Sequence, residues 1–366
     1  MRKSLSIYLD LLRLLAALGV LIGHSQNLLT PWVSNRLSGH ASECVAVFFV
    51  LSGFVISFVT TERERTWQDY VSARFARIAS VVLLAIAVGF ALDFIGSRIN
   101  IAPYRTWHGW NLSPSPGEAI AYVTFTNEIW FRHAVIGTLE PYWSLGFEVP
   151  YYVAFAIASF TRGWWRVVLL LVWSAIVGPK ILTFLPLWLL GVGTFQITRG
   201  HRKPESWHSP VGAALFASSF IGFYIVRSIL TMHHGNIYMP TSALQLINTG
   251  IYFTLIGLAT SLNIVGFDML IGDRDIWKNT GGKMIRWLAG GSFSIYLFHL
   301  PMVVFMAALF PGIPSHPVLG VAALGLILLA TYACAELGER RKRPFRAVAD
   351  AILRRTLPRE KPTALH

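Results

Sequence analysis

The sequence has 366 residues, of which 54% are hydrophobic and only 13% are charged, and its formal net charge is +13. An average soluble domain carries about 25% charged residues, so this composition excludes an ordinary soluble fold and predicts an all-α integral membrane protein. The basic residues lie mainly in short segments between apolar runs and in the tail. There they set membrane orientation, and we expect no nucleic-acid partner.

Ten apolar runs are candidates for transmembrane helices. A segment that crosses hydrocarbon must satisfy its own backbone hydrogen bonds, and helices do so most simply. We therefore expect a polytopic bundle of about ten transmembrane helices, at residues 7–29, 43–60, 77–96, 142–160, 165–179, 181–198, 211–231, 242–264, 288–310 and 317–337. The fifth and sixth runs meet at Gly178-Pro179-Lys180, which is compatible with a tight hairpin or with one broken helix.

The distribution of lysine and arginine predicts the orientation of the bundle. If the N-terminus lies inside, most basic residues of the connecting segments also lie inside. The outer segments then carry only Arg36, Arg98, Arg105, Arg132 and Lys180. We therefore expect both termini in the cytoplasm.

One domain accounts for nearly the whole chain. We expect a ten-helix domain over residues 1–340, with a long outer loop at 97–140 that is too long for a simple turn. A basic cytoplasmic tail follows at 341–366, and we expect it to lie on the anionic inner leaflet.

The first apolar run carries three ionisable residues, Asp10, Arg13 and His24. A charge at the centre of a bilayer costs about 3 kcal/mol even on the lenient insertion scale, so such residues usually face a bundle interior or a wet cavity. Eleven residues separate Arg13 from His24, which places them within about 20° on a helix surface and about 16 Å apart along its axis. We interpret His24 as a candidate general base, because a neutral imidazole can deprotonate a hydroxyl group.

A carboxylate near the start of the fourth run is a candidate partner for His24. Glu148 could hold the imidazole in one tautomer, as the acid does in a catalytic triad. Ser144 shares the helix face of Glu148, and Trp143 precedes it. Trp143 could stack on a sugar, although tryptophans near the outer face are also typical of the aromatic belt.

Two further groups lie on other runs. His299, with Tyr296 one turn before it, could contact substrate or His24, although a polar contact between helices would also explain it. Arg74 and Arg77 lie one turn apart at the inner end of the third run. Arginine forks match phosphate oxygens, so this pair could hold a phosphorylated donor, or it could serve only as positive-inside anchoring.

Five motifs, taken in order, resemble those of the acyltransferase-3 family of membrane acyltransferases. They are LDLLRLLAALGVLIGH, FFVLSGFVIS, ARFARIAS, PYWSLGFEVPYY and FSIYLFHLP. Each is weak alone, but together they cover most of the chain. The sequence departs from the family pattern after Glu148, where Val149 and Pro150 stand in place of an acidic residue and a glutamine.

The resemblance implies a bundle that moves an acyl group, usually acetyl from acetyl-CoA, onto a hydroxyl of a cell-envelope or exported glycan. It implies His24 as the catalytic residue and Arg13, Arg74 and Arg77 as donor contacts. It also implies a multi-pass protein of the bacterial inner membrane, with acyl-CoA as a co-substrate and no tightly bound cofactor. Because no hydrolase-like domain follows in this sequence, we expect direct transfer to the glycan or to a separate partner.

Two rival functions of other classes remain open, a transporter and a non-catalytic scaffold that would function normally after His24→Ala. A proton- or ion-coupled transporter or flippase could use Arg13 and His24 as a relay. Such proteins often show an inverted repeat and paired broken helices, which this sequence lacks. No metal site is predicted, because the histidines of the outer loops have no carboxylate or cysteine partners at ligand spacing.

Overall fold

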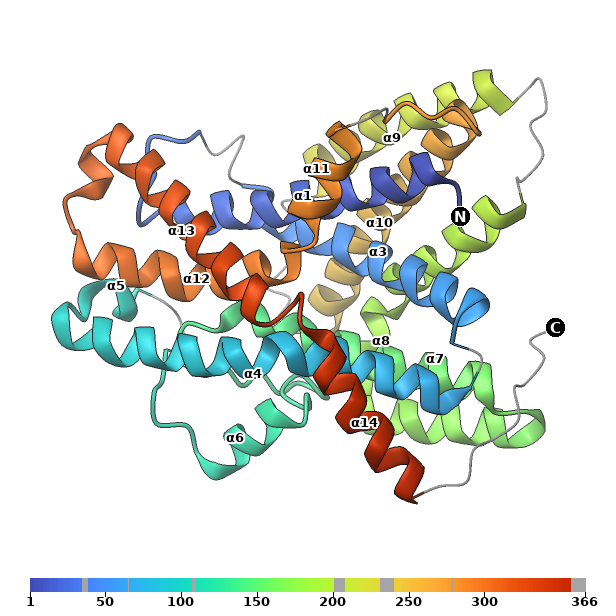
Figure 1. Cartoon of the computed structure of the whole chain (residues 1–366), viewed down its shortest axis with the longest axis horizontal. Helices are drawn as coiled ribbons and strands as arrows, with labels where there is room; N and C mark the ends of the chain where they lie inside the picture. The colour runs from blue at the N-terminus through green and yellow to red at the C-terminus, as the bar shows by residue number, and fades with distance from the viewer. Residues whose placement is uncertain are drawn as a thin grey trace.

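A computed structural model describes residues 1–34, 39–64, 66–106, 110–200, 208–230, 240–277 and 280–356, and within these ranges the regular elements are all helical. The long helices are α1 (Lys3–Ser25), α3 (Ala41–Glu62), α4 (Trp67–Ile99), α7 (Leu145–Phe160), α8 (Gly163–Gly200), α9 (His208–Leu230), α10 (Ala243–Ile271), α12 (Ser292–Leu309) and α13 (Pro317–Leu337). The shorter elements are α5 (Ala102–Arg105), α6 (Pro116–Val123), the 3-10 turns η1 (Glu140–Ser144) and η2 (Ile313–Ser315), α11 (Thr280–Ala289) and α14 (Lys342–Thr356). Figure 1 shows the long helices gathered into one bundle.

The all-α membrane architecture is confirmed. Eight helices of the described chain are long and apolar enough to cross a membrane. Each of the ten predicted runs overlaps a helix, although α7 has only 16 residues and α8 contains both the fifth and the sixth runs.

The chain reverses direction within α8, which decides between the two interpretations of this segment in favour of a hairpin. Gly178 has φ 79° and ψ 177°, a conformation that essentially only glycine adopts. Before this point α8 runs antiparallel to α7, with the Trp173 indole N–H donating to the Pro150 carbonyl. After it α8 runs parallel to α7, because Phe184 packs on Phe147 and the later Trp188 packs on the later Phe155. Figure 1 shows α8 doubling back beside α7.

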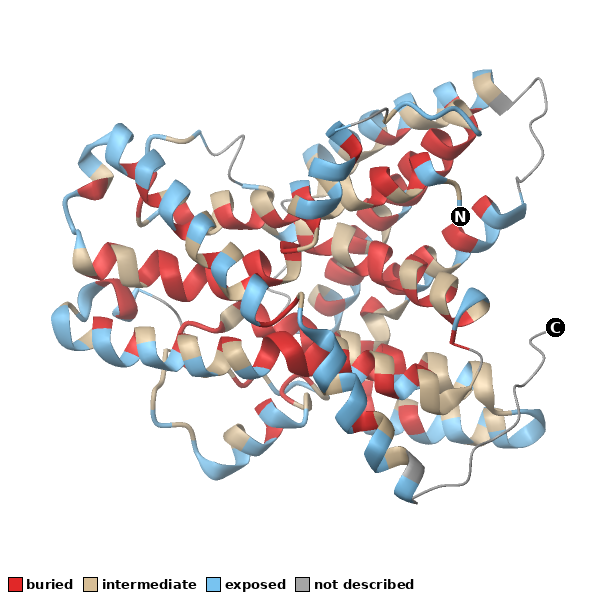
Figure 2. Cartoon of the chain, in the orientation of Figure 1, coloured by how far each residue is buried: buried red, intermediate tan, exposed pale blue. Residues whose placement is uncertain are grey.

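Helix α12 lies in the core of the bundle. Figure 2 shows α12 buried along most of its length, whereas α13 exposes much of its surface. Helix α12 is apolar all round, which is the pattern of a helix with neighbours on every side, and it contacts α1, α4 and α13. The residues on α12 are therefore fixed by packing.

The N-terminus is tied to the end of α10. The Arg2 guanidinium forms ion pairs of 2.9 Å with both Asp268 and Asp273, and Lys3 pairs with Asp275 at 2.7 Å. The start of α1 and the end of α10 consequently lie on the same face of the bundle.

Part of the long loop at 97–140 is held against the α8 hairpin by a buried ion pair. The Lys180 ammonium is fully buried and lies 2.6 Å from the Glu128 carboxylate, whose other oxygen contacts His133 at 2.8 Å. The backbone N–H of Trp130 donates to the Val177 carbonyl. This part of the loop therefore packs as a folded cap.

Candidate active site

Two histidines from opposite ends of the sequence meet inside the bundle. The Nδ1 atom of His24 on α1 lies 2.7 Å from the Nε2 atom of His299 on α12, and the two rings are almost coplanar, with an interplanar angle of 3°. His299 is fully buried. The pair exists because α1 and α12 pack side by side.

The hydrogen bonds of His299 fix the tautomers of both rings. Its Nδ1 atom faces the backbone carbonyls of Ile295 at 3.1 Å and Tyr296 at 2.7 Å. Carbonyl oxygens only accept, so Nδ1 of His299 must carry the hydrogen, and in a neutral ring Nε2 is then the acceptor. The Nδ1 atom of His24 must therefore donate to it. The basic lone pair of His24 is left on its Nε2 atom, which is the atom that a general base uses.

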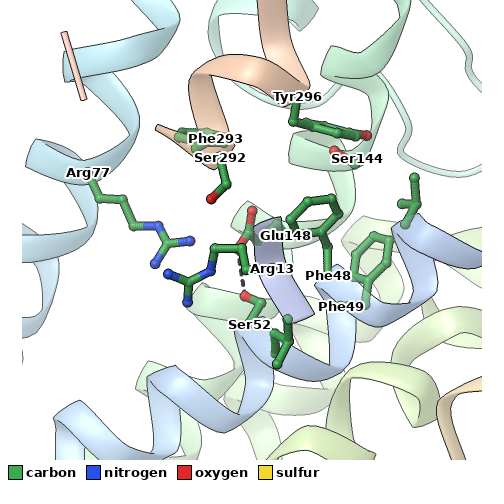
Figure 3. A pocket seen from close by; sticks show the side chains of 12 residues that line it. Arg13, Phe48, Phe49, Ser52, Arg77, Ser144, Glu148, Ser292, Phe293 and Tyr296 are labelled. Carbon is green, nitrogen blue, oxygen red and sulfur yellow. Dashed lines mark hydrogen bonds between the residues drawn. The ribbon is translucent and has the colours of Figure 1, made fainter. Parts of the chain in front are cut away.

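A small cavity of about 50 Å³ lies next to this pair. Figure 3 shows Arg13 and Arg77 at one end of the cavity and Tyr296 with Ser144 at the other. Its other labelled side chains are Phe48, Phe49, Ser52, Glu148, Ser292 and Phe293. Neither histidine lines the cavity, but the Tyr296 ring lies 6.2 Å from the His299 ring. Tyr296 therefore lies against both the cavity and the histidine pair.

The cavity has a cationic end that suits an anion. Arg13 from α1 and Arg77 from α4 both line it, although they are far apart in sequence. Figure 3 shows the two guanidinium groups close together, and like charges at short range repel unless an anion lies between them. Asp10 lies 3.7 Å from Arg13. Glu148, which lines the same cavity, acts on both arginines, so the two carboxylates offset part of this charge.

The sequence offers Glu148 as a candidate partner for His24, but the hydrogen bonds that the structure describes for its carboxylate are with other residues. Its carboxylate accepts hydrogen bonds from the Ser52 hydroxyl at 2.6 Å and from the Tyr152 hydroxyl, and it lines the cavity that contains Arg13. The place expected for a carboxylate beside His24 is taken by His299. The pairing could not be found from spacing, because it depends on which helices are neighbours.

The two arginines of α4 face different surroundings. Arg77 lines the cavity, whereas Arg74 is ion-paired with Glu64 at 2.6 Å and lines a separate groove between α4 and α7. Side chains three residues apart on a helix differ by about 60° in direction. This difference is enough for Arg77 to reach the cavity while Arg74 reaches the groove.

Two side chains that lie near the start of α12 were not among the candidate site residues. The Ser292 hydroxyl is buried, lines the cavity and has no hydrogen-bond partner among the described residues. The Glu339 carboxylate accepts from both the backbone N–H and the hydroxyl of Ser294 at 2.9 Å. An acid at this position satisfies an orphan N–H of the helix end. The available sequence signal for Glu339 was its position two residues after the last predicted transmembrane run.

The outer aromatic residues divide into two groups. Trp143 is buried and packs against Phe49 and Phe147, whereas Trp130 is 52% exposed. The outer-loop residues Trp107, His108, His233 and His234 lie outside the described residues. Among those described, no group of three or more histidine, cysteine or carboxylate side chains is arranged to hold a metal ion.

Comparisons with known proteins agree with the sequence motifs. Residues 6–336 match a family described as the acyltransferase domain. O-acetyltransferase OatA of Staphylococcus aureus (strain NCTC 8325 / PS 47) is 23% identical over 364 residues, which cover 81% of this chain and 50% of that protein. Exopolysaccharide production protein ExoZ of Rhizobium meliloti (strain 1021) is 25% identical over 316 residues, covering 79% of this chain and 86% of that protein.

The chain thus spans about half the length of the first of these relatives. No solved structure matches the chain.

Proposed function

This chain belongs to the acyltransferase-domain family, and from that premise we propose that it moves an acyl group, most simply acetyl, from cytoplasmic acyl-CoA to a hydroxyl of a cell-envelope or exported glycan. The names of the two relatives, an O-acetyltransferase and an exopolysaccharide production protein, support this class of reaction and acceptor. The single observation that carries the proposal is the His24–His299 pair beside a cavity with a cationic end.

The donor occupies the cationic end in this proposal. Phosphate oxygens of acyl-CoA accept charge-assisted hydrogen bonds from Arg13 and Arg77, and the buried Ser292 hydroxyl offers a further donor. Arg13 and His24 are eleven residues apart on one helix, or about 16 Å along its axis. An extended pantetheine arm spans this distance and passes Tyr296 on its way to the histidines.

The acceptor arrives from the outer side. The Nε2 atom of His24 takes the proton of the glycan hydroxyl as its oxygen attacks the thioester carbonyl. The new C–O bond forms, the C–S bond breaks, and the His24 imidazolium returns the proton to the departing thiolate. His299 is a positioning residue here, because its Nε2 atom holds the Nδ1–H of His24 and so fixes the productive tautomer.

Purified protein in lipid vesicles, supplied with labelled acetyl-CoA and candidate glycans, tests this function. We expect wild-type protein to label the glycan and His24→Ala to lose about 10² to 10⁴ of the rate, the range for loss of a general base. His316→Ala is a matched control, because His316 is exposed in a loop, and it should retain full activity. Full transfer by His24→Ala would contradict the mechanism. Solute counterflow without acyl transfer would favour the transporter alternative.

A further inference from the structure

A second, larger hollow lies on the side of the bundle, away from the catalytic cavity. It has a volume of about 550 Å³ and runs between α4 and α7. Apart from Arg74 and three tyrosine hydroxyls, the side chains that line it are hydrocarbon, from Tyr70 to Ile86 on α4 and from Val149 to Ile157 on α7. We call this the lateral groove.

The lateral groove opens toward the bilayer. Three of its lining residues, Phe75, Leu83 and Val153, are 47%, 60% and 48% exposed. In a membrane-spanning bundle, apolar side chains exposed in this way meet lipid chains. The occupant of the groove is therefore expected to be hydrocarbon along most of its length.

One end of the groove carries a fixed cation with hydrogen-bonding capacity to spare. The Arg74 guanidinium is held by Glu64 and lies over the rings of Tyr70 and Tyr152, at 5.4 and 5.9 Å. Arg74 is only 9% exposed, yet its Nε atom has no hydrogen-bond partner among the described residues. An arginine has five N–H donors in a rigid fork that matches phosphate.

The surroundings of this end are basic as well. Helix α14 packs against α4, and the charge of Arg346 on α14 acts on Glu64. The exposed face of α14 combines Arg343 and Arg355 with the apolar Val348 and Ile352. Such a basic amphipathic helix is typical of a segment that lies on an anionic leaflet.

The part of the groove that runs along α4 is about as long as one leaflet is thick. Twelve residues separate Arg74 from Ile86, or about 18 Å along a helix. Half of a hydrocarbon core of about 30 Å is about 15 Å. A lipid with its headgroup at Arg74 would therefore place one acyl chain along the groove without crossing far beyond the midplane.

We propose that the lateral groove binds one anionic phospholipid of the inner leaflet, with its phosphate on Arg74 and an acyl chain between α4 and α7. The bound lipid also touches the reaction site through one side chain. Tyr152 lines the groove, and its hydroxyl donates to Glu148, which lines the catalytic cavity.

Native mass spectrometry of the full chain in detergent tests this proposal without reference to transferase activity. The protein is titrated with phosphatidylglycerol and, separately, with phosphatidylcholine of the same acyl chains. We expect one phosphatidylglycerol per chain, bound about tenfold more tightly than phosphatidylcholine. Both lipids carry a phosphate, but the quaternary ammonium of phosphatidylcholine is repelled by the basic residues at this end of the groove.

Two variants with matched controls locate the site. Arg74→Gln should remove the preference for the anionic headgroup, whereas Arg162→Gln, an exposed arginine near the start of α8, should keep it. Ala156→Phe should fill the groove and weaken both lipids, whereas Ala322→Phe on the exposed surface of α13 should weaken neither.

The proposal is overturned if wild-type protein does not distinguish the two lipids, or if Ala156→Phe binds phosphatidylglycerol as tightly as wild type does. Size-exclusion chromatography shows which variants fold. If Arg74→Gln does not fold, Ala156→Phe decides the result by itself.

Discussion

At the scale of single residues, the unusual feature is an imidazole where many hydrolases and transferases place a carboxylate. The Nε2 atom of His299 lies 2.7 Å from the Nδ1 atom of His24, and its own Nδ1–H donates to backbone carbonyls, which suits a neutral His299 with Nε2 as the acceptor. A neutral partner avoids the cost of burying a carboxylate among apolar helices. It also provides no negative charge to stabilise the imidazolium, so we expect a base tuned by hydrogen bonding.

Replacing His299 should slow catalysis without weakening donor binding. His299→Ala removes the acceptor for the Nδ1–H of His24, so the imidazole can adopt the wrong tautomer, and we expect kcat to fall by about 10² to 10⁴, as when a triad loses its orienting group. KM for acyl-CoA should stay close to the wild-type value. Steady-state kinetics in vesicles separates the two constants.

A conservative variant separates orientation from packing. The side-chain oxygen of His299→Gln can accept the same hydrogen bond, so this variant should recover part of the lost kcat. If the alanine and glutamine variants are equally slow, or if the change appears in KM, His299 does not act by orienting His24.

Arg77 should show the opposite kinetic pattern. Arg77→Gln removes a charge from the cavity end while leaving the histidine pair intact, so KM for acyl-CoA should rise by about 10- to 100-fold, the value of one hydrogen bond to a charged group. Arg199→Gln changes an exposed arginine that lines a different hollow near the N-terminus and should not alter KM. A fall in kcat with unchanged KM in Arg77→Gln would place the donor phosphates elsewhere.

The sequence predicts which candidate residues share a helix face, but it does not predict which residues of other helices they contact. The stripe from Arg13 to His24 follows from helix periodicity alone, because both lie on one helix. The contacts of Glu148 and His299 depend on which helices are neighbours and how each is rotated, and a single sequence does not contain this information. The same limit applies to Arg74 and Arg77, which the spacing treats as one pair and the structure separates.

At the scale of elements, the α8 hairpin depends on one glycine. A Cβ atom at Gly178 would lie 2.7 Å from the Trp130 side chain and 2.8 Å from its Cα atom, and the φ of 79° excludes other residues independently. The sequence identified this break but left two geometries open. Gly178-Pro179 predicts an interruption in any helix. The direction that the chain takes after this interruption depends on packing against Trp130 and on the Lys180–Glu128 ion pair.

Gly178→Ala should therefore destabilise the protein. We expect a loss of at least about 2 kcal/mol, from the strained backbone and the contact with Trp130, visible as a lower Tm in a thermal unfolding assay in detergent. Gly193→Ala is the matched control, because Gly193 lies later in the same helix with open space around it. That change should leave Tm unchanged or raise it slightly, since alanine favours a helix by about 0.5 to 1 kcal/mol. Equal Tm values for the two variants would contradict the hairpin geometry.

The apolar runs predicted the long helices because length and hydropathy suffice for that purpose. They did not predict the fold of the long outer loop, whose order comes from contacts across the sequence. Asp93 of α4, for example, accepts hydrogen bonds from the backbone N–H and the hydroxyl of Thr138, both at 2.6 Å. Such pairs have no local signature.

At the scale of the whole molecule, the proposed reaction requires the donor and the acceptor to enter from opposite faces. The positive-inside distribution predicts that both termini lie in the cytoplasm, and the ion pairs of Arg2 place the end of α10 on the same face as the N-terminus. The residues around 113 should then be outside and those around 280 inside.

Thiol labelling tests this orientation. In a background with Cys44→Ser and Cys334→Ser, an impermeant maleimide added to intact cells should label Ser113→Cys but not Thr280→Cys, since both positions are exposed in the structure. Permeabilised cells should label both. Labelling of Thr280→Cys in intact cells would reverse the orientation and with it the direction of transfer.

The large sequence separation between the two histidines also determines when their contact can form during synthesis. His24 and His299 are 275 residues apart, and the α1 anchor on Asp268 and Asp273 is equally late. During synthesis from the N-terminus, α1 enters the membrane long before α12 is made. His24 therefore has no contact with His299 until most of the protein has left the ribosome. Because the proposed mechanism needs both histidines, it predicts that a nascent or prematurely terminated chain is inert toward acyl-CoA until α12 has inserted.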